Sequence, residues 1–198
     1  MVAHMSSLFS FSSISKSSNN PAYVSFSMRP APGDRAKILV HPSGYSGQAP
    51  PIYSITISET STPNVIIFRG WGGGPWDIVG DSRLSTFSSK CHLTIQGQSM
   101  EMRLNKMSGT CTLEKPTMGK LKWKLDMTLK TLELRDASGT KLARLYSGKA
   151  SGEKILDILV PHDTWFLELV LLSGLTARMK NKTEMEAAGE ILSSILGA

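Results

Sequence analysis

The chain has 198 residues, a formal net charge of +6 and two cysteines. This length fits one domain with a sizeable core, because all-β barrels and sandwiches commonly reach it as single units. Cys91 and Cys111 have no second pair and no C-x-x-C motif, which argues against a zinc site or disulfide framework and indicates reduced thiols in an intracellular protein. The apolar run 165–172 has eight residues, whereas a membrane-spanning helix needs about twenty, so we expect no transmembrane helix.

Residues 1–21 predict a mobile, serine-rich tail. Eight serines lie among residues 6–18, and no continuous apolar segment follows a positive charge, so the pattern of a signal peptide is missing. We therefore predict a cytoplasmic protein in three parts: the tail 1–21, a folded domain 22–182 and a short amphipathic helix 183–198. The last part begins with the spacing of a capping box.

Alternation of apolar and polar residues, bounded by turn residues, predicts about twelve strands in the folded domain. The predicted strands cover residues 22–28, 37–40, 52–59, 64–69, 77–86, 90–96, 99–104, 110–114, 120–125, 131–136, 141–146 and 154–160. Glycines lie in several of the intervening turns, where a positive φ is needed. This pattern is typical of an antiparallel sheet built from successive hairpins.

The loop 69–76 has the sequence R-G-W-G-G-G-P-W and is the most unusual local segment. Trp71 and Trp76 on a glycine-rich arm suit a clamp for a planar or cationic ligand, or insertion into a membrane interface. A wide hairpin whose tryptophans cover the barrel end is the structural alternative. The loop lacks the G-x-x-x-x-G-K-[ST] motif, which argues against nucleotide binding.

The segment 115–149 contains nine basic and three acidic residues, so it carries a net charge of +6, equal to that of the whole chain. Within it, alternation places Lys120, Lys122 and Lys124 on one face of a strand whose other face is apolar. Together with Arg135 this face suits anionic lipid headgroups. Nucleic acid fits less well, because Trp123, the one aromatic residue of this strand, points inward and leaves no stacking platform.

Residues 162–178 predict a helix that is buried on all sides. Asp163 can cap its first turn after Pro161 ends the last strand, and the following residues are apolar on nearly every face. Such a helix must lie inside another structure, and the preceding elements are strands. We therefore predict a mainly β fold, with an antiparallel barrel of about twelve strands around a central apolar C-terminal helix, plus a short terminal helix.

Glu168 is the one acidic residue within this apolar helix. In one interpretation it is structural and pairs with a basic residue or water near the barrel mouth, because an unpaired buried carboxylate is costly. In the other it is a functional acid with a raised pKa, and Asp77 and His92 are further candidates for proton transfer. No metal-ligand spacing or Ser-His-Asp order occurs, so we expect neither a metal nor a cofactor.

The predicted architecture resembles the tubby C-terminal-like fold of tubby domains, plant LURP-one-related proteins and phospholipid scramblases. Three features between residues 22 and 182 carry this resemblance: the strand-turn-strand L-E-L-R-D-A-S-G-T-K-L-A-R at 132–144, the strand 155–160, and the helix 166–178 with its basic end. The chain is most similar to the small stand-alone fungal members. The resemblance implies a lipid-binding barrel, but individual lipid contacts do not transfer, and the acidic calcium-related segment of scramblases is not visible.

Three hypotheses of function follow. The first is a non-enzymatic domain that binds anionic phospholipid through the basic face at a peripheral membrane. The second is a cofactor-free isomerase or cyclase that acts on a small apolar molecule in the barrel mouth. The third is an interaction protein whose C-terminal helix forms a homodimer. A lysine face that is only solvated is the alternative to all three.

Overall fold

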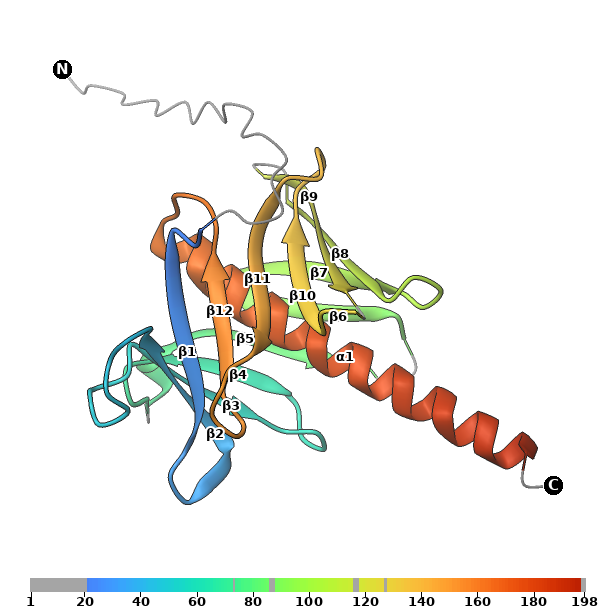
Figure 1. Ribbon diagram of the computed structural model, residues 1–198, viewed down its shortest axis with the longest axis horizontal. Helices are drawn as coiled ribbons and strands as arrows, with labels where there is room; N and C mark the ends of the chain where they lie inside the picture. The colour runs from blue at the N-terminus through green and yellow to red at the C-terminus, as the bar shows by residue number, and fades with distance from the viewer. Residues whose placement is uncertain (1–20, 73, 86–87, 116–117, 127, 197–198) are drawn as a thin grey trace.

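The computed structural model describes residues 21–196 except 73, 86–87, 116–117 and 127, and it describes only the backbone of residue 35 and of residues 184–196. Its strands form one closed antiparallel barrel in which each strand pairs with its neighbours in sequence (Figure 1). The barrel closes because β12 pairs with β1, with Phe26 opposite Leu156. The predicted fold class is confirmed. Residues 1–20 of the predicted tail lie outside the described residues.

All twelve predicted strands are present. Their bounds are β1 Val24–Ala31, β2 Asp34–Pro42, β3 Tyr53–Ile57, β4 Val65–Arg69, β5 Ile78–Leu84, β6 Lys90–Ile95, β7 Gln98–Asn105, β8 Thr110–Lys115, β9 Gly119–Asp126, β10 Thr131–Arg135, β11 Lys141–Ser147 and β12 Lys154–Ile158. A short 3-10 helix, η1, covers Pro75–Asp77 before β5. The first two strands are longer than predicted, because Gly33 adopts a φ of 78° and allows a tight turn that keeps Ala31 paired with Asp34.

The central helix α1 covers Thr164–Leu196 and passes through the barrel (Figure 1). Asp163 caps it, since the backbone N–H of Phe166 donates to the Asp163 carboxylate at 2.7 Å. From Phe166 to Ala177 every side of the helix is buried. Strand and helix fit closely at Gly174, where a Cβ atom would lie 3.0 Å from the Trp123 ring. The Trp123 indole N–H donates to the Ser173 hydroxyl at 2.9 Å.

The helix differs from prediction at its C-terminal end. It does not stop near Arg178 but continues without a break to Leu196, so residues 183–196 are the second half of α1 rather than a separate helix. Residues that favour caps bond back into the helix instead: the Asn181 amide donates to the Ala177 carbonyl and the Thr183 hydroxyl donates to the Met179 carbonyl. The last turns project beyond the strands (Figure 1).

Polar and sulfur groups lie where the helix leaves the barrel. Lys180 is buried, and its ammonium donates to the Ser85 carbonyl at 2.7 Å. Cys91 and Cys111 are free and buried, and burial raises their pKa values to about 11 and about 12. Both thiols are therefore protonated at neutral pH and unreactive. Within the described residues, no helix has the length and apolar character needed to cross a bilayer.

Candidate functional site

Cross-strand register aligns basic side chains on the outer face of β6 to β11. The strands pair so that six outward-facing residues follow one another around the barrel, separated by about 4.8 Å from strand to strand. We call this set the basic row: Lys90, Arg103, Thr112, Lys122, Arg135 and Lys141. Five of its six members are cations. The row crosses half of the strands in the barrel and is not visible as a run in the sequence.

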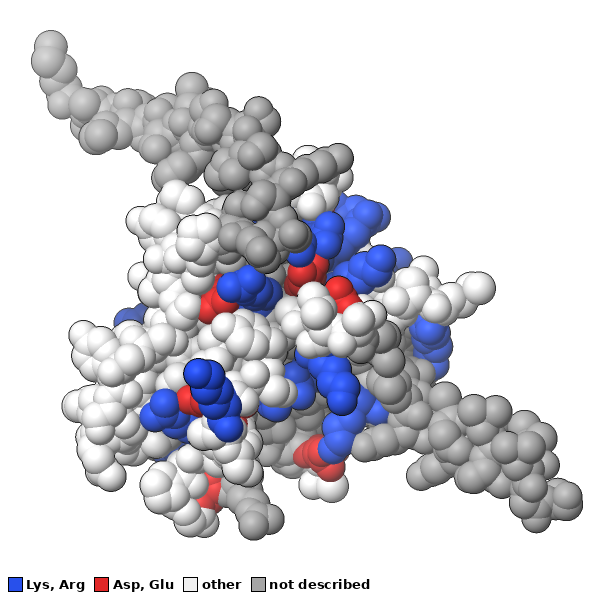
Figure 2. Space-filling view, in the orientation of Figure 1, with Lys and Arg blue, Asp and Glu red and all other residues white. Residues whose placement is uncertain are grey.

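A second line of charge runs along β9 and meets the basic row at Lys122. Lys120, Lys122 and Lys124 are exposed, whereas the residues between them are buried against α1, as alternation predicts. Successive lysines are about 6.6 Å apart along the strand. We call the basic row together with Lys120 and Lys124 the basic wall. In Figure 2, Lys and Arg side chains gather over β8 and β9 with acidic side chains among them.

Two glutamates neutralise the ends of the row. Glu133 pairs with Arg135 and Lys141, each at 2.6 Å. Burial alone would raise the pKa of Glu133, but hydrogen bonds from Lys141 and Arg135 outweigh it and hold that pKa below its ordinary value. Glu101 pairs likewise with Arg103 and Lys90, and these bonds lower its pKa too.

The centre of the basic wall lacks such neutralisation. Lys122 and Lys124 make no ion pair or hydrogen bond with any residue that the structure describes. Lys122 also lies directly opposite Arg135 on the next strand. Like charges in this position destabilise a sheet by about 0.2–1 kcal/mol. Lys122 is therefore an exposed cation without an ion pair among the described residues, and Arg135 beside it is already paired with Glu133.

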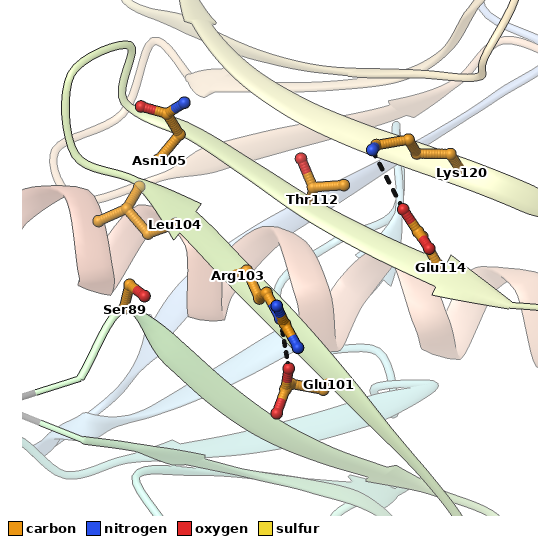
Figure 3. Close-up of a pocket in the computed structure, with 8 residues that line it drawn as sticks. All are labelled: Ser89, Glu101, Arg103, Leu104, Asn105, Thr112, Glu114 and Lys120. Atoms are coloured by element: carbon orange, nitrogen blue, oxygen red, sulfur yellow. Dashed lines mark hydrogen bonds and ion pairs between the residues drawn. The ribbon is translucent and has the colours of Figure 1, made fainter.

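The surface next to this centre is hollowed (Figure 3). Thr112 on β8 lies between the Glu101–Arg103 ion pair on β7 and the Glu114–Lys120 ion pair. The cavity has a volume of about 660 Å³ and is lined by Ser89, Glu101, Arg103, Leu104, Asn105, Thr112, Glu114 and Lys120. A second cavity of about 570 Å³ lies against Glu114, Lys115, Gly119 and Lys120. Both open on the outside of the barrel, beside the basic wall.

Glu168 is fully paired inside the barrel mouth. Its side chain is 1% exposed and accepts hydrogen bonds from the Tyr53 hydroxyl at 3.1 Å, the Gln96 amide at 2.6 Å and the Arg69 guanidinium at 3.3 Å. Burial, and then the Glu168 charge, raises the pKa of Tyr53, so the phenol keeps the proton that it donates. This arrangement favours the structural interpretation of Glu168. Neither of the two cavities includes it.

The other predicted proton-transfer residues do not join Glu168. His92 is exposed on the outer face of β6, because its neighbours Cys91 and Leu93 occupy the inward positions. Asp77 is exposed in η1, where its carboxylate accepts the Gly74 backbone N–H at 3.2 Å. The barrel wall separates His92 from Glu168. The structure therefore does not assemble these three residues into one catalytic site.

Trp71 and Trp76 lie apart from the lysines. Their loop folds back along the outer face of β3, since the Trp71 carbonyl accepts hydrogen bonds from Lys37 and Ser54, both at 2.8 Å. Strand β3 is six strands from β9 in a ring of twelve, on the opposite wall. Trp71 and Trp76 are 54% and 96% exposed, so Trp76 is almost free of packing contacts. The predicted ligand contacts thus divide into two surfaces, and only the lysines and Arg135 lie together.

Four members of the basic row were not predicted: Lys90, Arg103, Thr112 and Lys141. Only the register of successive hairpins aligns these residues, and no local sequence motif identifies them. The two-residue turn at Gln96 and Gly97, for example, fixes Lys90 opposite Arg103. Tracing register across several hairpins would have aligned them.

Comparisons of the chain with protein-family models, with curated proteins and with solved structures give no match. Among the residues that the structure describes, no group of three or more His, Cys, Asp or Glu side chains is arranged to hold a metal ion. The interpretation of the basic wall therefore rests on its own charge and geometry.

Proposed function

We propose that the protein binds anionic phospholipid headgroups at the surface of a membrane through the basic wall. The observation that carries this proposal is the pair of exposed lysines that form no ion pair with a described residue, Lys122 and Lys124, although Glu133 lies opposite Lys124 on β10. Each basic residue near an anionic membrane contributes about 1 kcal/mol to binding. The role is one of binding and uses no catalytic group.

The shape of the barrel supports contact along β9. Lys120, Lys122 and Lys124 share one outer face of a single strand, so a flat surface that rests on β9 meets all three. Lys90 on β6 is three strands away and Lys141 on β11 is two strands away, so the surface curves them back from the plane. The two ends of the row contribute less to such a contact than its centre.

The resemblance to the tubby C-terminal-like fold supports the same proposal from another direction. A closed barrel of twelve antiparallel strands around a C-terminal helix is the architecture that the resemblance implies. Lipid-surface binding is an expected property of that group. The contact residues proposed here come from the charge and register of this chain alone.

Co-sedimentation with vesicles tests the proposal. The double substitution Lys122→Ser and Lys124→Ser removes two charges from the centre, and we expect it to weaken partition onto vesicles containing phosphatidylserine by about 30-fold, equivalent to about 2 kcal/mol. The matched control, Lys90→Ser with Lys141→Ser, removes the same charge from the ends. Glu101 and Glu133 each keep one arginine partner in this control.

The control should retain most of the wild-type binding. Equal loss in both double variants would show that net charge alone, not contact along β9, determines binding. Failure of the wild-type protein to co-sediment with phosphatidylserine vesicles at low salt would refute the proposed function.

A further inference from the structure

A covered polar compartment lies on the outside of the barrel over β1 and β2. Ser27 and His41 point outward from these strands, because the alternate residues Met28 and Val40 belong to the core. They are nevertheless only 3% and 1% exposed, and the loop between β2 and β3 reaches His41 through the Ala49 carbonyl. This compartment is separate from the barrel interior. It is also far around the barrel from β9 and the basic wall.

Two polar atoms in this compartment have no hydrogen-bond partner among the described residues: the Ser27 hydroxyl oxygen and Nδ1 of His41. The other ring nitrogen, Nε2, lies 2.9 Å from the Ala49 carbonyl oxygen and must donate to it. In the neutral tautomer that this bond assigns, the proton is on Nε2 and Nδ1 is the acceptor. Buried polar atoms without partners are rare and require an explanation, of which a catalytic role is one.

The register places these two atoms together. Ser27 and His41 are direct cross-strand partners, and such residues have Cα atoms about 5.5 Å apart or closer. One is a hydroxyl donor and the other a basic acceptor. The two atoms do not hydrogen-bond to each other in the structure, so the dyad requires rotation about the Cα–Cβ bond of Ser27. Nucleophile and base are often poorly aligned before substrate binds.

We propose that Ser27 and His41 form a nucleophilic dyad that accepts an acyl group from an activated ester. Ser27 is the nucleophile and His41 Nδ1 is its general base. The Ala49 carbonyl holds the ring and its tautomer, the role that a carboxylate has in a Ser-His-Asp triad.

The Ser27 oxygen forms a bond to the ester carbonyl carbon while its proton moves to His41 Nδ1. The bond from that carbon to the leaving alkoxide then breaks, and the proton on Nδ1 passes to the alkoxide to release an alcohol. Water attacks the acyl-serine with the same proton transfers, releases the carboxylic acid and restores Ser27.

The covering loop can admit a substrate without losing its hold on His41. Residues 44–48 at its tip are exposed, and Gly44 adopts a φ of 89°. The backbone hydrogen bonds described for the tip stay within the loop, such as that from the Ala49 N–H to the Ser46 carbonyl at 3.0 Å. The proposed reaction requires the compartment to open at Ser27 while Ala49, at the base of the loop, stays bonded to His41.

A fluorophosphonate probe with mass spectrometry tests the dyad in the full chain. The probe forms a bond from phosphorus to the serine oxygen, fluoride leaves, and the base takes the hydroxyl proton. We expect one adduct, located on Ser27 and absent from the Ser27→Ala variant. Ser25→Ala is the matched control: Ser25 lies on the same face of β1 but donates to Asp157, and its loss should leave labelling of Ser27 intact.

His41→Gln separates the base from the support of the loop. The glutamine amide can reach the position of Nε2 and donate to the Ala49 carbonyl, but it offers no base. Labelling of Ser27 should slow by about 100-fold or more in this variant. No adduct on Ser27 in folded wild-type protein would overturn the proposal, and so would equal labelling rates in wild type and His41→Gln. If Ser27 and His41 have only a structural role, one of these two results is expected.

Discussion

The interior of the barrel and the basic wall differ in how their charged side chains are paired. Glu168 is surrounded by apolar residues, and three side chains from β3, β4 and the turn after β6 satisfy it. Lys122 lies in solvent next to another cation, and no described residue neutralises it. A buried charge that is fully paired is explained by folding, because leaving it unpaired is costly. An exposed charge is solvated by water and needs no partner for folding, so in the proposed function an anionic headgroup supplies the counter-charge of Lys122.

The largest effect should follow from placing an unpaired charge in the interior. Leu172→Asp adds a carboxylate to a fully buried helix position and removes core packing, so we expect loss of cooperative folding. Circular dichroism during thermal unfolding measures this. Leu129→Asp, at an exposed turn, is the control and should unfold like wild type. A soluble Leu172→Asp protein with a cooperative transition would contradict the central position of α1.

A smaller loss should follow when the partners of Glu168 lose their acceptor. Glu168→Leu leaves the Tyr53 and Gln96 donors without it, and we expect a fall in unfolding free energy of about 2–4 kcal/mol. Glu168→Gln keeps an acceptor oxygen and should cost about 1 kcal/mol. Urea unfolding monitored by tryptophan fluorescence distinguishes them. Equal stability of both variants would show that the buried network contributes nothing.

Sequence and structure agree where a pattern is local. Alternation along 120–125 predicted both faces of β9, and the apolar helix predicted a closed container around it. The continuation of α1 past Arg178 was not predicted, because capping residues such as Thr183 have a second use within a helix, bonding to the carbonyl four residues earlier.

The candidate sites depend on distant pairing, which local patterns do not reveal. The partners of Glu168 lie 72 to 115 residues away in the chain. The sequence therefore identified the unusual acid but not what satisfies it. Likewise, the sequence named both Trp71 and Lys122 as candidate ligand contacts, and only the strand order shows that they lie on opposite walls. The Ser27–His41 pair carries no motif, because the two residues meet only through the register of β1 and β2.

Salt should act on the wall and leave the interior unchanged. We expect partition onto anionic vesicles to fall steeply between low and 0.5 M sodium chloride, since the Debye length is about 8 Å at physiological ionic strength and about 3 Å at 1 M. The Lys122→Ser, Lys124→Ser variant should show a shallower dependence, because fewer charges remain to be screened. Thermal unfolding across the same salt series should move little. Salt-independent vesicle binding would contradict an electrostatic contact.

The smallest effect concerns Glu133, which neutralises one end of the basic row. Its pKa is lowered in the folded protein, so its ionised form stabilises the fold above the ordinary pKa of a glutamate, near 4.3, and this contribution disappears as pH falls through the lowered value. Because its partners Arg135 and Lys141 are partly exposed, the contribution should be at most about 1 kcal/mol. Urea unfolding between pH 7 and pH 3 should therefore show a steeper loss of stability in wild type than in Glu133→Gln.

At pH 7 the same variant frees Arg135 and Lys141, which adds one positive charge to the wall, and vesicle binding should rise by up to about fivefold. Weaker binding by Glu133→Gln would mean that the ion pairs orient the wall instead of masking it.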